Sequence, residues 1–149
     1  MPGFTKKEVS KITGLNPRQV QFYTEQGVVI PAEDRGEGRG KARRYSMKNL
    51  ADFALIQHLA DFGVTVNKIR SLVMDLSWGG MLDAASEIRK DTAVRYYLIF
   101  FKRGDEYKHK FQKLGKDEDA ILTGKLMQNY PECFIIDLNR MLKKLESVK

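Results

Sequence analysis

Three polar side chains that suit the recognition of DNA bases lie close together near the start of the chain. Arg18, Gln19 and Gln21 fall within the stretch NPRQVQFYTEQG, residues 16–27. In the major groove an Arg side chain can pair with guanine, and a Gln side chain can pair with adenine. Exposed polar residues also occur on helices that bind nothing, so the surrounding elements decide which interpretation holds.

A short helix is predicted just before this stretch. Thr5 and Glu8 have the spacing of a capping box, in which each side chain bonds the backbone of the other residue. Gly14 can supply the left-handed residue that commonly ends a helix. The pattern therefore predicts a helix at about residues 6–13.

A second short helix is predicted to carry the polar side chains. Asn16 is a favoured N-cap residue, and Pro17 suits the first helical position because its missing N–H costs nothing there. The helix should run to about residue 26, with a core-facing stripe made of Val20, Tyr23, Thr24 and Gly27. Two short helices joined by a three-residue turn form a helix-turn-helix, which is typical of DNA binding but also occurs as an ordinary helical hairpin.

A basic segment follows the second helix. Residues 35–48 hold six positive side chains and one negative side chain, a net charge of +5. Clustered cations displace counterions from phosphates and so favour polyanion binding, although a solvated loop is an equally common explanation. The stretches VVI (28–30) and ARRY (42–45) are expected to pair as a hairpin with a glycine-rich tip.

Two further helices are predicted after the hairpin. Ser46 is expected to cap a helix at about residues 47–61, and Thr65 one that runs to about residue 76. The apolar spacing predicts the buried residues Leu50, Phe53, Ala54, Leu59, Ile69, Leu72 and Val73.

Taken in order, these motifs resemble the DNA-binding domain of the MerR family of bacterial transcription regulators over roughly residues 4–76. The matching stretches are TGLNPRQVQFY (13–23), GVVIP (27–31), ARRYS (42–46) and FGVTVNKI (62–69). The resemblance implies a winged helix-turn-helix fold. It also implies a dimer that distorts promoter DNA for RNA polymerase.

The resemblance also implies roles for individual residues. Arg18 would contact a base or a phosphate, the Tyr23 hydroxyl and Arg43 would contact the DNA backbone, and Tyr45 would lie either in the core or at the DNA. Gln21 stands where the family has an arginine, and Ala42 stands where it has the first wing tyrosine. The predicted DNA-binding residues are Asn16, Arg18, Gln19, Gln21, Phe22, Tyr23, Arg39, Lys41, Arg43, Arg44 and Tyr45. Among them, Arg39, Lys41 and Arg44 are the candidates to compensate for Gln21.

The second half departs from the long coiled-coil helix that such regulators usually carry. Ser77-Trp78-Gly79-Gly80 is expected to interrupt the chain, and the helix expected at 81–90 would span only about 15 Å. The predicted fold class is mostly α with a small β content. It comprises a winged helix-turn-helix at 1–76, a short connecting helix at 77–93 and a small α+β effector or dimerisation module at 94–149.

The α+β module is predicted as ββαβα. Strands are expected at 94–102, 107–114 and 133–136, with a turn at 104–105 and a helix at about 117–128. The closing amphipathic helix aligns Leu138, Met141, Leu142 and Leu145. Six aromatic residues are expected to form the core of the module, with an effector pocket as the alternative: Tyr96, Tyr97, Phe100, Phe101, Tyr107 and Phe111.

Composition argues against several other functions. Cys133 is the only cysteine, and His58 and His109 are the only histidines, so no disulfide, metal site or cofactor is expected. Cys133 is predicted to be a small core residue, and His58 to be structural or half-exposed. No catalytic set, membrane span or export signal is recognisable, which favours a non-enzymatic protein of the cytoplasm.

These observations predict a sequence-specific, double-stranded-DNA-binding regulator that acts as a homodimer on an inverted repeat. A small-molecule effector is a further possible partner. The alternative is an architectural protein that bends DNA, as in excision or chromosome organisation, without a role at promoters.

Overall fold

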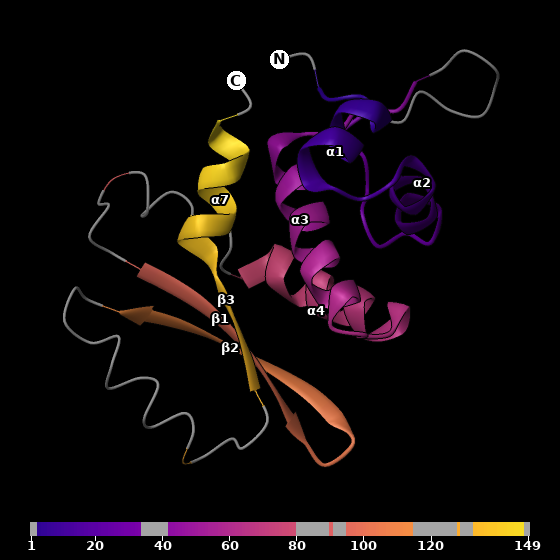
Figure 1. The fold of residues 1–149 in the computed structure, drawn as a ribbon. Helices are drawn as coiled ribbons and strands as arrows, with labels where there is room; N and C mark the ends of the chain where they lie inside the picture. The colour runs from indigo at the N-terminus through magenta and orange to yellow at the C-terminus, as the bar shows by residue number, and fades with distance from the viewer. Residues whose placement is uncertain are drawn as a thin grey trace. The chain divides into compact units, whose positions relative to one another are not determined.

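The computed structural model describes residues 3–33, 42–79, 90, 95–114, 128 and 133–147, and it divides the chain into two compact units (Figure 1). The first unit comprises Met1–Trp78 with Ser147–Lys149, and the second comprises Gly79–Glu146. The first is helical in its described part, whereas the second combines a small sheet with a helix.

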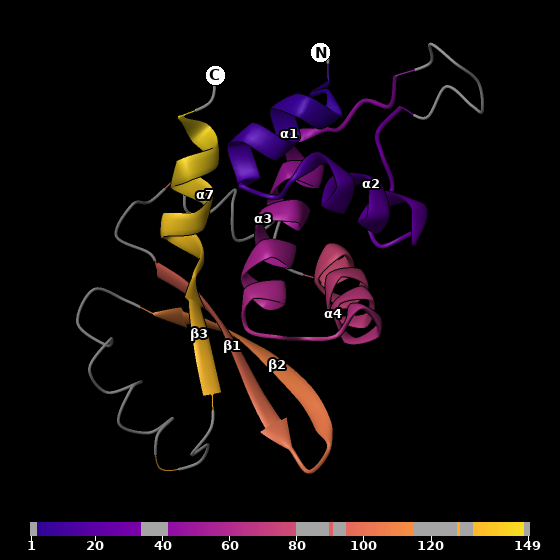
Figure 2. The ribbon, with the colours of Figure 1, turned by 45° about the vertical axis from the view of Figure 1, so that its right-hand side comes forward.

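Four helices build the first unit. They are α1 (Lys6–Thr13), α2 (Pro17–Glu25), α3 (Met47–Asp61) and α4 (Val66–Gly79). The first of them, α1, packs against both α2 and α3, which Figure 2 shows from a second direction. Three of the helices begin with a capping box, made by the pairs Thr5–Glu8, Asn16–Gln19 and Ser46–Asn49. Because each box satisfies two backbone N–H groups, it fixes the residue at which the helix starts.

The core of the first unit is centred on α3. Residues 49–56 are buried without interruption, so this helix is covered on all sides. All seven residues predicted to be buried in α3 and α4 are buried. The prediction of a helical unit with these start positions is confirmed.

The hairpin prediction for residues 28–30 is wrong. The backbone N–H groups of Val28 and Val29 both donate to the carbonyl of Tyr23, at 2.9 and 3.3 Å. The Val28 bond, together with the bond from the Gly27 N–H to the Thr24 carbonyl at 3.0 Å, closes the end of α2 in a Schellman motif. Gly27 lies outside the helix with φ 69° rather than in the buried stripe. Antiparallel bridges form instead between Glu33 and Arg44 and between Phe4 and Tyr45.

The interruption predicted at residues 77–80 is also wrong over most of its length, because α4 continues to Gly79. Ser and Trp have ordinary helix propensities, and a Gly costs little at a helix end. Of the connecting helix predicted at 81–90, only Lys90 lies within the described residues, where it is helical.

The second unit contains a three-stranded antiparallel sheet. Its strands are β1 (Arg95–Arg103), β2 (Glu106–Leu114) and β3 (Cys133–Asp137), in the order β2-β1-β3, and α7 (Leu138–Glu146) contacts β1 and β3. Gly104 adopts φ 66° in the two-residue turn between β1 and β2, as a tight hairpin requires. The predicted strands and closing helix are confirmed. The helix predicted at about 117–128 lies outside the described residues except for Gln128.

Phe100 forms part of the core of this sheet. It is 1% exposed, stacks on Phe134 at 4.8 Å between ring centroids, and meets the ring of His109 at 6.4 Å. The core role is thus confirmed for Phe100, whereas Tyr96, Tyr97 and Phe101 are half-buried. The side chains of Tyr107 and Phe111 lie outside the description.

Cys133 is half-buried, so its prediction as a core residue is wrong. It lies at the outer end of the short strand β3, opposite Phe101, where the ladder with β1 stops. None of the helices that the structure describes is long and apolar enough to cross a membrane.

Candidate nucleic-acid interface

The turn between α1 and α2 is fixed by backbone geometry and by a side-chain cap. Gly14 ends α1 with φ 82°, and its N–H donates to the carbonyl of Ser10. Asn16 Oδ1 then accepts from the backbone N–H of Gln19 at 2.8 Å, while Gln19 Oε1 accepts from the backbone N–H of Asn16 at 3.0 Å. The start of α2 is therefore held from two sides, at the residue that the sequence predicts.

A mainly polar face of α2 is open to solvent. Val20, Tyr23 and Thr24 are buried, which leaves the exposed residues Arg18, Gln19, Gln21, Phe22 and Glu25. In the described part of the chain, no hydrogen bond or ion pair engages the side chain of Arg18. The Phe22 ring is 42% exposed and meets Tyr23 edge-on, at 5.3 Å between centroids. This face agrees residue by residue with the one predicted to lie outside the core.

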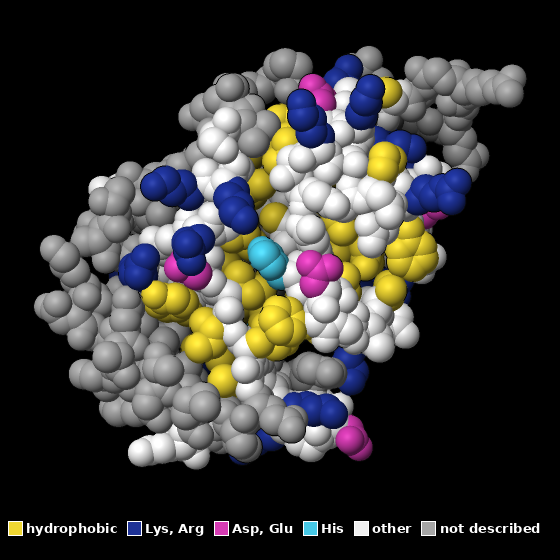
Figure 3. Space-filling model, viewed as in Figure 1, with side chains coloured by type: hydrophobic (Ala, Val, Ile, Leu, Met, Phe, Trp, Pro, Cys, Tyr) yellow, Lys and Arg dark blue, Asp and Glu magenta, His cyan; other side chains and the backbone are white. Residues whose placement is uncertain are grey.

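Gln21, which stands in place of the family arginine, connects α1 with α2. Its Oε1 accepts from Lys6 Nζ at 3.1 Å, and its Nε2 donates to Glu25 Oε1 at 2.7 Å. The space-filling view shows Lys and Arg side chains gathered over α1 (Figure 3). The Lys6 ammonium therefore lies beside the position that lacks the arginine. Sequence reasoning missed Lys6, because nothing in the spacing of residues 6 and 21 indicates that their side chains meet.

The base of the wing, formed by the bridged residues Glu33 and Arg44, is bonded to the N-terminal segment. Arg44 pairs with Glu33 through the backbone, and its Nη1 donates to the carbonyl of Gly3 at 3.2 Å. Hydrogen bonds from Thr5 hold the pKa of Glu8 below its ordinary value, and Arg44 adds a smaller effect in the same direction. The bond to the Gly3 carbonyl places the Arg44 guanidinium beside the segment that precedes α1. Arg39 and Lys41 lie outside the described residues, and Arg43 is half-buried.

Tyr45 connects the base of the wing to α2 within the core of the first unit. It is 1% exposed, its ring meets Phe53 edge-on at 5.4 Å, and its hydroxyl lies 3.0 Å from Thr24 Oγ1. Because the Thr24 hydroxyl already donates to the Val20 carbonyl at 2.8 Å, Tyr45 is the donor in this pair. Of the two positions that the sequence left open, Tyr45 occupies the core.

Tyr23 is also largely covered, at 6% exposure. Burial raises the pKa of its hydroxyl above the ordinary value, so the group stays protonated at neutral pH. A protonated phenol at the margin of the surface can donate a hydrogen bond but carries no charge toward a phosphate.

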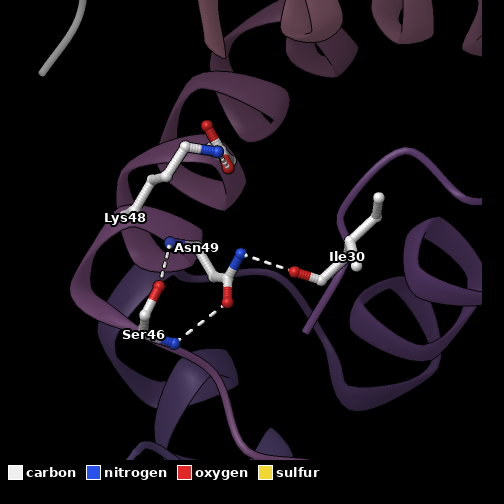
Figure 4. A network of polar contacts seen from close by, with 5 residues as sticks. Ile30, Ser46, Lys48 and Asn49 are labelled. Carbon is white, nitrogen blue, oxygen red and sulfur yellow. Dashed lines mark hydrogen bonds and ion pairs between the residues drawn. The ribbon is translucent and has the colours of Figure 1, made fainter. Parts of the chain in front are cut away.

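Asn49 fixes the segment that leaves α2 against the start of α3. Its Oδ1 accepts from the backbone N–H of Ser46 at 2.9 Å, and its Nδ2 donates to the carbonyl of Ile30 at 2.9 Å (Figure 4). The Ile30 side chain itself is 79% exposed. The buried amide of Asn49 therefore caps α3 and also fixes the segment between α2 and the wing.

Asp52 is a charged group in an unfavourable position. It is 3% exposed, its Oδ2 lies 3.5 Å from Lys48 Nζ, and its Oδ1 has no hydrogen-bond partner among the described residues. Burial raises the pKa of its carboxyl to about 6, although Lys48 acts in the opposite direction. The side chain thus costs stability at neutral pH rather than adding to it.

No cluster suited to a metal ion occurs among the described residues, counting groups of three or more His, Cys, Asp or Glu. His58 is half-buried on α3, as expected from its place on a mostly apolar helix. Of the predicted polar and basic residues that the structure describes, Asn16, Arg18, Gln19 and Gln21 belong to α2 and its cap, and Arg43 and Arg44 lie at the bridge that Arg44 forms with Glu33. Lys6 of α1 joins the α2 group through its bond to Gln21.

The site consists of a short exposed helix, fixed by caps as the second helix of a helix-turn-helix, together with the base of a wing. This arrangement is typical of one class of regulatory DNA-binding domain. Residues 4–75 match the family described as MerR HTH family regulatory protein. This segment of the chain belongs to the MerR family of helix-turn-helix regulatory proteins.

Curated relatives agree with this assignment. HTH-type transcriptional regulators described as uncharacterized, from Mycobacterium bovis and from two strains of Mycobacterium tuberculosis, are each 27% identical to this chain over 84 residues. The match covers 56% of this chain and 37% of each relative. The chain thus matches little more than a third of the length of these proteins.

Proposed function

We propose that this chain is a sequence-specific transcriptional regulator that binds double-stranded DNA through α2. The observation that carries the proposal is the exposed face of this nine-residue helix, with Arg18 open to solvent above buried Val20 and Thr24. A helix mounted in this way fits the major groove, and the residues near its N-terminus meet base edges there.

Phosphate contacts would come from both sides of α2. Lys6 takes over the charge that Gln21 lacks, because its ammonium lies within hydrogen-bond distance of that residue. On the other side, Arg43 and the basic segment at 39–41 would reach the backbone. Lys and Arg contacts of this kind fix the register of a protein on a duplex without reading its sequence.

We further propose a homodimer on an inverted repeat, which distorts promoter DNA for RNA polymerase. Family resemblance supports this step, since two-fold symmetric proteins read two-fold symmetric sites. The unit at 79–146 would supply dimerisation, effector sensing or both, and the protein would act in the cytoplasm without catalysing a reaction.

Titration of a labelled mixed-sequence duplex with the purified chain tests DNA binding. The dissociation constant should rise steeply between about 50 and 200 mM salt, since each neutralised phosphate contributes about 0.9 to the logarithmic slope. Sedimentation of the complex should give two chains per duplex. Undetectable binding at low salt would refute the function, and one chain per duplex would refute the dimer.

A further inference from the structure

The first turn of α2 has its side-chain acceptors already occupied. Asn16 Oδ1 faces the N–H of Gln19, and Gln19 Oε1 faces the N–H of Asn16. A backbone N–H can only donate, so the oxygen of each amide points to the backbone and the orientation of both amides is defined. Each oxygen keeps one further lone pair, whereas no bond within the described residues engages the NH₂ group of either amide.

Gln21 is committed in the same way. Its oxygen accepts from Lys6 Nζ and its nitrogen donates to Glu25, at 3.1 and 2.7 Å. A Gln side chain reads adenine by offering an acceptor and a donor together. To read adenine, Gln19 or Gln21 would have to use the second lone pair of an oxygen that already accepts a bond, and Gln21 would also have to use a nitrogen that already donates one. These bonds make adenine a less favourable target for either glutamine than its side-chain type alone suggests.

Arg18 completes the pattern. A guanidinium carries five N–H donors and no acceptor, and no described residue occupies those donors. At the first turn, residues 16–19, the side-chain groups that are not engaged by described residues are therefore mostly donors. Guanine is the one base that shows two acceptors, N7 and O6, in the major groove.

We propose that the first turn of α2 reads guanine, with Arg18 and Gln19 donating to its acceptors, so that each half-site contains a G·C pair at this position. The inference rests on the proposed function and deepens it, because it names the base class that the helix prefers. It also assigns Gln19 two tasks: its oxygen caps α2, and its nitrogen faces the DNA.

The test uses the full-length chain and a duplex carrying the half-site enriched from a random library. Replacing the guanine of that half-site by 7-deazaguanine, which lacks the N7 acceptor, should weaken binding by about 5- to 150-fold. Replacing adenines by purine, which lacks the N6 amino group, should change affinity by less than about twofold. A half-site without guanine, or a larger loss with purine than with 7-deazaguanine, would overturn the inference.

The matched variant is Gln19→Glu. A glutamate at this position still accepts the Asn16 N–H and keeps the capping box, so the thermal unfolding midpoint should not fall. The donor is lost, and the ratio of specific to mixed-sequence affinity should drop by about 5- to 150-fold. Taking this ratio removes the effect of the added charge. An unchanged ratio would overturn the role of Gln19, whereas failure of the wild-type chain to bind any duplex would refute the proposed function itself.

Discussion

The two units of this chain use polar groups in different ways. In the first unit, polar side chains connect distant segments: Tyr45 bonds Thr24, Asn49 bonds the Ile30 carbonyl, and Arg44 bonds the Gly3 carbonyl. In the second, strand ladders and an apolar core dominate, and the described side-chain bonds to backbone N–H groups lie at the ends of α7 and β1.

The difference indicates that the exposed surface of the first unit is preorganised. A network that fixes α2, the wing base and α3 together holds the exposed face of α2 in one geometry, and preorganised groups lose little entropy on binding. The sheet of the second unit has a defined core, and its described side-chain bonds to backbone N–H groups lie at the ends of elements rather than across an exposed face. We therefore expect DNA recognition to reside in the first unit.

The largest effects should separate the two cores. Phe53→Ala and Phe100→Ala each delete a buried ring, so each should lower the free energy of unfolding of its unit by about 3–5 kcal/mol. Phe53→Ala should also abolish binding to a mixed-sequence duplex, whereas Phe100→Ala should retain it. Urea unfolding and duplex titration measure both. Equal loss of binding in the two variants would contradict the difference between the two units in DNA binding.

Asp52 should make the first unit less stable as pH rises. Its folded pKa of about 6 lies above the ordinary 3.8, so folding favours the protonated form. The contribution of Asp52 to the free energy of unfolding is therefore most favourable below about pH 3.8 and declines as pH rises through 6. Asp52→Asn should therefore stabilise the protein by up to about 3 kcal/mol at pH 8, and much less at pH 4. Urea titrations at the two pH values would show it, and a gain that does not vary with pH would contradict the burial argument.

Arg18→Ala should reduce affinity for the preferred site by about 1–3 kcal/mol, because one base contact is lost. Lys11→Ala is the matched control, since it removes an exposed charge from α1 of the same unit. Binding isotherms for the preferred and the mixed-sequence duplex give the specificity of each variant. If both variants lose the same affinity on both duplexes, Arg18 contributes only charge.

Tyr45→Phe should destabilise the first unit by about 0.5–1.5 kcal/mol, since it removes one buried hydrogen bond and leaves Thr24 bonded to Val20. Tyr97→Phe offers the comparison in the second unit, where Tyr97 is half-buried and its hydroxyl lies 3.5 Å from Arg95 Nη1, at the limit of a hydrogen bond. That variant should change stability by less than about 0.5 kcal/mol. Chemical denaturation resolves the two, and a larger effect at Tyr97 would reverse the ranking.

The smallest effect is expected at Lys6. Lys6→Ala should reduce the logarithmic salt slope of duplex binding by about 1, as the loss of one phosphate contact does. Affinity for different sequences should fall alike. A slope equal to that of the wild-type chain would remove Lys6 from the interface.

Helix starts were predictable from sequence because their caps are local. Thr5, Asn16 and Ser46 each lie three residues before their partners, and the structure places all three where the pattern predicts. The outward face of α2 was predictable for the same reason, since helical spacing alone separates Arg18 from Val20. The three strands of the second unit and the pairing of β1 with β2 followed from apolar runs and a turn signal, whereas the pairing of β1 with β3 was not predicted.

Contacts between distant residues were not predictable. VVI has strand propensity, yet Gly27 turns the chain so that Val28 and Val29 close α2 instead. The bond from Lys6 to Gln21 spans 15 residues, and only the packing of α1 on α2 creates it. The occupied amide oxygens of Gln19 and Gln21 likewise change what these residues can recognise, although their types alone favour adenine.

DNA recognition by the first unit is tested most directly by selecting binding sites from a random duplex library with the purified full-length chain. We predict enrichment of an inverted repeat. Arg18→Ala should lose that enrichment, whereas Lys11→Ala should keep it. Salt-sensitive binding without any consensus would contradict sequence reading by α2 and would favour an architectural, DNA-bending role instead.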